Sequence, residues 1–162
     1  MKIIRNGVFE TNSSSTHSIT MCMKSDYEKW KNGELYYFEG SETGFVTEEE
    51  RDEIIRKNII YNKLNIDYDK KTITFKGKII HYEDYEDRYK KEETFYTKEN
   101  LEEITQEEIN NYMEEKFNIY KIPCTYKEWN EYYNYERETY KDDFKTPNGE
   151  EIVSFGYYGC DG

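Results

Sequence analysis

The residues best suited to chemistry lie in one polar stretch near the start of the chain, "TNSSSTHS". A serine nucleophile needs a base such as histidine within hydrogen-bond reach. Residues two apart on a strand face the same way, so Ser15 and His17 can meet, and Ser13 and Ser15 can present their hydroxyls together. No GxSxG or SxxK frame surrounds these serines. We therefore predict no catalytic residue, and we consider Asn12, Ser13, Ser15 and His17 a candidate ligand-binding turn.

The same stretch also has a structural interpretation. Asn and Ser side chains readily bond backbone groups in turns. On that basis residues 12–16 form an ordered turn between two strands, and the polar side chains serve the turn itself. Both interpretations fit the sequence.

Metal ligands would have to come from residues scattered along the chain. His81 lies beside several acids in "KIIHYEDYED", and histidine together with carboxylates can hold a metal. Nothing in the spacing of His17, His81, Asp84 and Cys160 requires these residues to converge. We therefore predict neither a metal site nor a cofactor.

The cysteines and the apolar runs indicate a compartment. Cys22, Cys124 and Cys160 are widely spaced and form no CxxC pair, which is typical neither of a disulfide framework nor of a zinc site. We expect reduced, unpaired thiols. The opening "MKIIRNGVFE" lacks the apolar core of a signal peptide, and no apolar run is long enough to span a membrane. These features predict a cytoplasmic protein that does not bind membranes.

The chain is strongly acidic, with 35 acids, 23 bases and a formal net charge of −12. Nucleic-acid binding needs clustered Lys and Arg, which disfavours direct contact with DNA or RNA. The negative field attracts a basic protein surface instead, although such charge also serves plain solubility. The densest acidic patch between tyrosines is predicted to bind a partner, and it consists of Glu83, Asp84, Tyr85, Glu86 and Asp87.

Alternation of apolar and polar residues predicts strands over residues 2–10, 17–23, 34–40 and 94–97. Within the second strand, Ile19, Met21 and Met23 share one face while Thr20 and Cys22 take the other. Two more strands are expected in the segment 144–159, around a Pro-Asn-Gly turn. "TITF" and "KIIHY" predict a hairpin, because Gly77 between them can take the positive φ of a tight turn.

Capping boxes predict where helices begin, since a Ser or Thr side chain and an acid three residues later cap each other's backbone. The pairs are Ser25 with Glu28, Thr47 with Glu50, Thr105 with Glu108, and Thr125 with Glu128. The helix after Thr47 carries an apolar stripe of helical period at Ile54, Ile55, Ile59 and Leu64. The stretch "HYEDYEDRYKKEE" alternates tyrosines with charges and suits an exposed strand or a loop.

This order of elements predicts an α+β fold with a largely antiparallel sheet and three or four helices, in a single compact domain over residues 1–162. Eighteen tyrosines and eight phenylalanines supply much of the apolar area, so the core should be aromatic. The tail "SFGYYGCDG" has rings that are costly to leave in water. We expect it to pack beside the first strands, with its glycines marking a close approach of backbone or ligand.

Both ends of the chain also carry a resemblance. "IRNGVFETNSSSTHSITMC", followed by "DYEKWKNGEL", and the ending "EEIVSFGYYGCDG" resemble small proteins found in phages and prophages of low-GC Gram-positive bacteria. The likeness covers roughly the first 35 residues and the final dozen. It implies an accessory gene of a mobile element in a bacterial host, and it carries over no catalytic residue.

Together these features favour a non-enzymatic, phage-type accessory protein that binds another protein. Its most concrete form is an anti-defence, anti-CRISPR-like inhibitor, whose acidic, tyrosine-rich face covers a basic surface of a host nucleic-acid-binding defence protein. The competing hypothesis is a small enzyme or nucleotide-binding protein. Its site would join the Asn12–His17 turn to the glycine-rich tail.

Overall fold

The computed structural model describes residues 3–10, 15–39, 41, 44–116, 118, 121–135 and 137–160, with only the backbone described for residues 3–10, 15–17 and 160. The chain divides into two compact units. Unit 1 comprises Met1–Arg51 and Asn118–Gly162, and unit 2 comprises Asp52–Phe117. The boundary between them falls within the helix α2, Glu48–Lys63.

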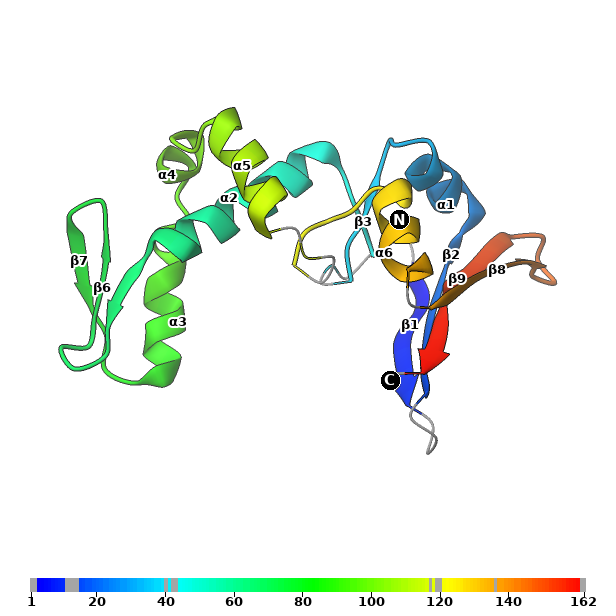
Figure 1. Ribbon diagram of the computed structural model, residues 1–162, viewed down its shortest axis with the longest axis horizontal. Helices are drawn as coiled ribbons and strands as arrows, with labels where there is room; N and C mark the ends of the chain where they lie inside the picture. The colour runs from blue at the N-terminus through cyan, green and yellow to red at the C-terminus, as the bar shows by residue number, and fades with distance from the viewer. Residues whose placement is uncertain are drawn as a thin grey trace. The chain divides into compact units, whose positions relative to one another are not determined.

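Unit 1 contains a four-stranded antiparallel sheet (Figure 1). Its strands are β1 (Ile3–Glu10), β2 (Ser15–Met23), β8 (Glu138–Lys145) and β9 (Glu151–Cys160). The order across the sheet is β1-β2-β9-β8, so β9 lies between the N-terminal hairpin and its own hairpin partner. The prediction that the tail packs beside the first strands is confirmed.

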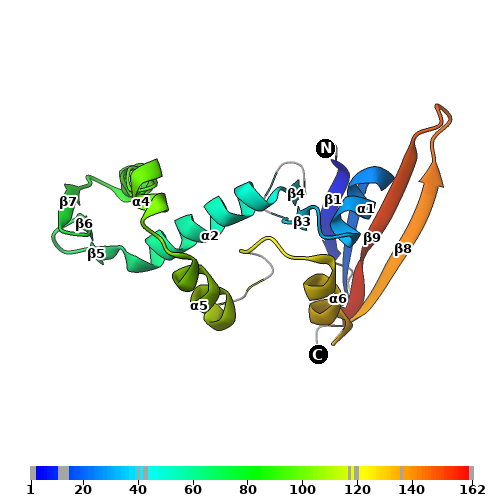
Figure 2. The ribbon, with the colours of Figure 1, turned by 90° about the horizontal axis from the view of Figure 1, so that it is seen from above.

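Helices α1 (Lys24–Lys31) and α6 (Tyr126–Asn134) cover one face of this sheet, as Figure 2 shows. A short pair of strands, β3 (Tyr36–Tyr37) and β4 (Phe45–Val46), completes the unit. The predicted strand over residues 34–40 is therefore confirmed only at its centre.

The core of unit 1 is aromatic, as the composition predicts. Trp30 of α1 is fully buried, and its ring contacts those of Tyr27, Tyr37, Phe45, Tyr126, Trp129 and Phe155. Several of these contacts are edge-to-face, the arrangement that the ring quadrupole favours. The indole N–H also donates to the backbone carbonyl of Cys124 at 3.0 Å.

The two faces of β2 separate as the alternation predicts, with Ser18, Thr20 and Cys22 buried and Ile19 and Met21 only partly so. The more polar of the two faces is the buried one, because that face meets the helices and β3. There the Thr20 hydroxyl lies 2.8 Å from the Tyr37 hydroxyl and gains a hydrogen bond.

Three of the four predicted capping boxes are present. Thr47 with Glu50, Thr105 with Glu108, and Thr125 with Glu128 each show the reciprocal bonds. The prediction for Ser25 is wrong. Helix α1 follows β2 without a loop, so Met23 occupies the N-cap without a side-chain bond and Ser25 lies within the first turn.

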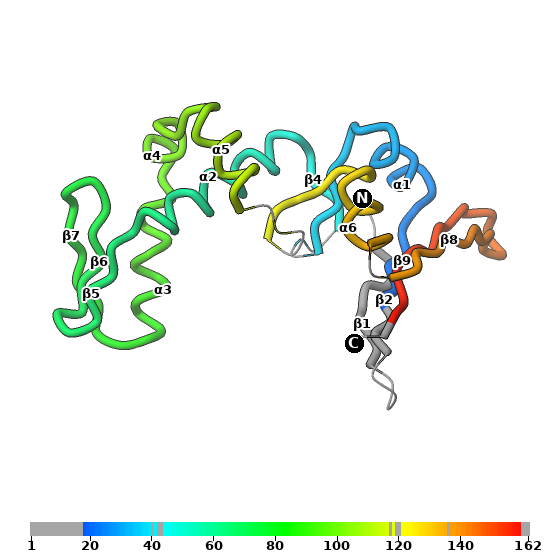
Figure 3. Tube along the Cα trace, viewed as in Figure 1, coloured from blue at the N-terminus to red at the C-terminus, as the bar shows by residue number. Residues whose placement is uncertain are grey.

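Unit 2 combines a small sheet with helices (Figure 3). The strands are β5 (Asn65–Asp67), β6 (Thr72–Phe75) and β7 (Lys78–His81). The helices that follow α2 are α3 (Tyr85–Glu93), α4 (Lys98–Glu102) and α5 (Gln106–Lys116). The predicted hairpin is confirmed as β6–β7, with Lys76 at φ 47° and Gly77 at φ 80° in its two-residue turn.

Two local predictions in unit 2 fail. Residues 94–97 form no strand; they are the turn and cap between α3 and α4, and Thr97 caps α4 by accepting from the Asn100 backbone N–H. The stretch after His81, expected as a strand or loop, forms helix α3. Helix α3 packs against β6, and this tertiary contact, which the sequence of the helix alone does not reveal, supplies its buried surroundings.

The α+β class with antiparallel pairing is confirmed. The described residues form six helices where three or four were predicted, and α3 and α4 are the additional ones. Separately, none of the helices within the described ranges is both long and apolar enough to cross a membrane.

Candidate partner-binding site

The predicted ligand-binding turn falls mostly outside the described part of the chain. Asn12 and Ser13 lie outside the described residues, and for Ser15 and His17 only the backbone is described. That backbone belongs to β2, where Ser15 pairs with Cys160 and His17 with Tyr158. The two halves of the competing site, the turn and the tail, are therefore neighbours in the backbone, and the ligand-binding role of their side chains stays a prediction.

The predicted partner-binding residues mark the start of α3. Glu83 and Asp84 precede the helix, and Tyr85, Glu86 and Asp87 form its first turn. Two of the acids stabilise the start of the helix through hydrogen bonds. The Asp84 side chain accepts from the Asp87 backbone N–H at 2.9 Å, and Asp87 accepts from the Glu83 backbone N–H at 3.0 Å. Acids also suit a helix N-terminus because of its dipole. Glu83 and Glu86 are exposed and have no such structural bond in the described region.

Three exposed tyrosines surround one buried arginine beside these acids. The guanidinium carbon of Arg88 lies 4.5 Å from the ring centre of Tyr89, 5.0 Å from that of Tyr85 and 5.8 Å from that of Tyr68. Arg88 itself is buried, whereas Tyr85 is 68% and Tyr68 67% exposed. The arginine thus holds the rings by cation–π contact while the rings present their outer surfaces to solvent.

A buried ion pair fixes the arginine. Its Nε lies 3.1 Å from Oε1 of Glu92, one helical turn away on α3, and both side chains are almost fully buried. Burial raises the pKa of Glu92, and the charge of Arg88 opposes that rise. Arg88 also donates to the Tyr68 hydroxyl at 3.2 Å. Since Glu92 balances Arg88 inside the protein, the charge that a partner meets here comes from the four exposed or half-exposed acids.

We call this surface the tyrosine–acid face; it consists of Glu83, Asp84, Glu86, Asp87, Tyr68, Tyr85 and Tyr89. Sequence reasoning missed Tyr68 and Tyr89. Tyr89 is one turn after Tyr85, which an expectation of helix would have revealed. Tyr68 lies in the β5–β6 connection, and no local signal links it to α3.

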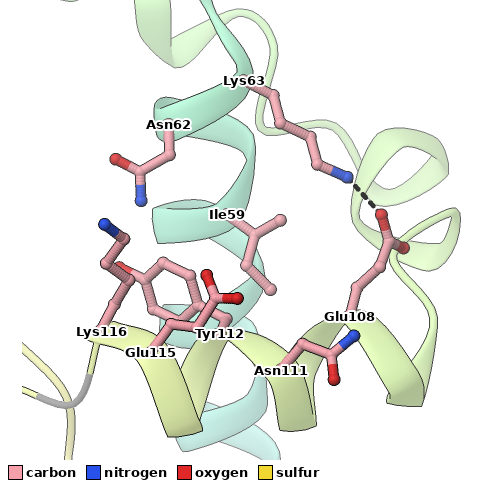
Figure 4. A pocket seen from close by; sticks show the side chains of 8 residues that line it. All are labelled: Ile59, Asn62, Lys63, Glu108, Asn111, Tyr112, Glu115 and Lys116. Carbon is pink, nitrogen blue, oxygen red and sulfur yellow. Dashed lines mark hydrogen bonds and ion pairs between the residues drawn. The ribbon is translucent and has the colours of Figure 1, made fainter.

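A groove of about 460 Å³ lies between α2 and α5 (Figure 4). Ile59 and Tyr112 form its apolar part, and Asn62 and Asn111 add amides on either side. An ion pair between Lys63 and Glu108 closes one end. The groove is open, and most of its polar side chains are exposed. We therefore interpret the residues that line it as the contacts that hold α2 and α5 together.

Glu108 should make the stability of unit 2 depend on pH. Lys63 and the Thr105 backbone hold its pKa at about 2, below the ordinary 4.5. A carboxylate with a lowered pKa stabilises the fold above pH 4.5, and that stabilisation is lost as the pH falls toward 2. Because the side chain is partly exposed, we expect about 1 kcal/mol after solvent screening.

Thermal unfolding of the native chain and of Glu108→Gln, at pH 6 and pH 3, measures this contribution. The native chain should lose about 1 kcal/mol more than the variant between the two pH values. Equal losses would show that the Lys63–Glu108 pair is not maintained in solution.

The cysteines that can be described offer no nucleophile. Cys22 and Cys124 are free thiols in the core. Burial raises the pKa of Cys22 to about 12 and also raises that of Cys124, so both stay protonated and unreactive at neutral pH. His81 is exposed at the end of β7. Among the described side chains, no three His, Cys, Asp or Glu residues gather as metal ligands would.

Comparison of the chain with protein-family models, with curated proteins and with solved structures finds no match.

Proposed function

We propose that this protein acts by binding a basic surface of another protein through the tyrosine–acid face of unit 2. The observation that carries the proposal is the arrangement of Tyr68, Tyr85 and Tyr89 around the buried Arg88. Exposed rings held in place before binding lose little entropy when a partner docks, and tyrosine is enriched among the residues that dominate binding energy.

The chemistry of the face selects the partner's charge. Carboxylates of Glu83 and Glu86 pair with Lys or Arg, and the outer faces of the rings accept the same cations. The net charge of −12 draws such a surface in over distance. Under the resemblance to phage proteins, the partner is the nucleic-acid groove of a host defence protein, which is basic for its own function.

A charge-reversal experiment tests the proposal. Glu83→Lys with Glu86→Lys changes the face but spares Asp84 and Asp87, whose bonds cap α3. The matched control, Glu34→Lys with Glu114→Lys, makes the same change of net charge at exposed positions elsewhere. Proteins retained from host lysate by the native chain and by the control, but not by the face variant, are the expected partners.

Binding kinetics with a purified partner then give the mechanism. The face variant should associate about tenfold more slowly than the native chain, and added salt should slow association of the native chain. Tyr85→Ala should chiefly speed dissociation, because a ring contact acts only after docking. A partner bound equally by the native chain and the face variant would refute the proposal.

A further inference from the structure

The buried Arg88 shows which kind of cation the rings of the tyrosine–acid face accept. Its guanidinium carbon lies over the rings of Tyr89, Tyr85 and Tyr68, at 4.5, 5.0 and 5.8 Å from their centres. The same guanidinium meets a carboxylate, since its Nε lies 3.1 Å from Oε1 of Glu92. Rings and a carboxylate together therefore form the environment of this buried cation.

The outward side of the tyrosine–acid face offers the same two kinds of group to solvent. Tyr85 is 68% and Tyr68 67% exposed, so each ring has surface that Arg88 leaves uncovered. The exposed acids Glu83 and Glu86 lie within two residues of Tyr85 at the start of α3. A cation that arrives from outside therefore meets rings and carboxylates, as Arg88 does from inside.

Two features keep this outward side attractive to a second cation. Glu92 pairs with Arg88, so the ion pair leaves little net charge behind the rings. The N-terminus of a helix carries partial positive charge, but at α3 the Asp84 side chain accepts a hydrogen bond from the Asp87 backbone N–H and brings a negative charge to that end. Neither the buried arginine nor the helix end therefore cancels the attraction of the exposed acids.

We propose that the tyrosine–acid face selects arginine over lysine, so that its partner is an arginine-rich segment of a protein. This inference rests on the proposed function, because it specifies the basic surface that the face binds. A guanidinium is planar and weakly hydrated; it stacks on aromatic rings and forms paired hydrogen bonds with a carboxylate, whereas an ammonium is a strongly hydrated point charge. Exposed rings beside exposed carboxylates therefore add more to the binding of arginine than to that of lysine.

Two peptides of equal length and charge test this selectivity, one rich in arginine and the other with lysine at the same positions. In titration calorimetry at about 0.15 M salt, the full chain should bind the arginine peptide about fivefold more tightly. At about 1 M salt the Debye length falls to about 3 Å. Binding of the lysine peptide should then be lost first, because stacking on a ring acts at short range and is screened less.

Variants of Tyr85 test whether the ring causes the preference. Tyr85→Leu keeps an apolar side chain but removes the ring, so the preference for the arginine peptide should fall to about twofold. Tyr85→Phe keeps the ring and should retain the full preference, which separates the ring from its hydroxyl. Tyr135→Leu makes the same change at a tyrosine of unit 1 that is 87% exposed, and it should bind both peptides as the native chain does.

The outcomes separate this inference from the proposed function. Equal binding of the two peptides by the native chain, lost in Glu83→Lys with Glu86→Lys, would overturn the arginine selectivity and leave the tyrosine–acid face as the binding surface. A full arginine preference in Tyr85→Leu would also overturn the selectivity. If the native chain bound neither peptide, or bound both no better than the face variant, the proposed function and this inference would fail together.

Discussion

Replacing Trp30 with alanine is expected to lower the free energy of unfolding of unit 1 by about 4 kcal/mol or more. Truncating a buried Trp costs about 3–5 kcal/mol through lost transfer energy and the cavity left behind. Here the ring contacts six other aromatic rings across α1, α6, β9 and the β3–β4 pair. Its loss also leaves the buried Cys124 carbonyl without the indole donor, which adds about 1–3 kcal/mol.

The measurement is urea unfolding followed by the fluorescence of Trp129. The chain has two tryptophans, and both belong to unit 1, so the remaining one reports this unit alone. Trp30→Phe keeps most of the ring but removes the donor, and should cost about 1–3 kcal/mol. Tyr135→Ala is the exposed control and should cost about 0.5 kcal/mol or less. A loss below about 1 kcal/mol for Trp30→Ala would contradict a core centred on Trp30.

Replacing Gly156 with alanine should destabilise unit 1 by about 3 kcal/mol or more. A Cβ at this position would lie 2.1 Å from the Ser18 backbone oxygen and 2.8 Å from the Tyr140 hydroxyl. The Ser18 oxygen cannot retreat, because it belongs to β2 at the centre of the sheet and accepts a 2.6 Å hydrogen bond from Tyr140. Overpacking of this severity exceeds the usual 1–3 kcal/mol or so of an extra methylene in a core.

Gly149→Ala is the matched control for Gly156→Ala. It makes the same change in the β8–β9 turn, where φ is +87° and no atom lies near the new Cβ, so only backbone strain of about 1–2 kcal/mol applies. Tryptophan fluorescence again follows both variants. Adding Tyr140→Phe should not rescue Gly156→Ala, since the Ser18 oxygen remains. Equal losses for the two glycines would contradict the close approach of β2 and β9 at Gly156.

Local signals in the sequence predicted local structure well. The hairpin at residues 72–81 and three capping boxes depend on residues within a few positions of one another, and they formed as expected. Ser25 failed because α1 continues directly from β2. Whether Ser25 can be an N-cap depends on where β2 ends, and a four-residue pattern does not contain that information.

The candidate site was predictable only in part. The acidic segment at Glu83–Asp87 stands out by composition, but its role as the start of a helix does not. Asp84 and Asp87 form a capping pair that uses Asp in place of the more familiar Ser or Thr with Glu. Tyr68 joins the site through Arg88, and that contact exists only after the β5–β6 connection and α3 have come together. The close approach at Gly156, in contrast, follows from the general rule for glycine in strands.

The central place of β9 sets the order in which the chain folds as it is made. Unit 2 is one continuous segment, Asp52–Phe117, so all its parts are available once that segment has emerged from the ribosome. Unit 1 must wait, because β2 pairs with β9, the last of the described strands. At about 5–20 residues per second, the delay between the synthesis of β2 and that of β9 is on the order of ten seconds. Throughout this delay, one edge of β2 has no partner and is open to pairing with other chains. The chain therefore needs the protection of a chaperone most while unit 2 is being synthesised, and slow codons in that segment would prolong the exposure.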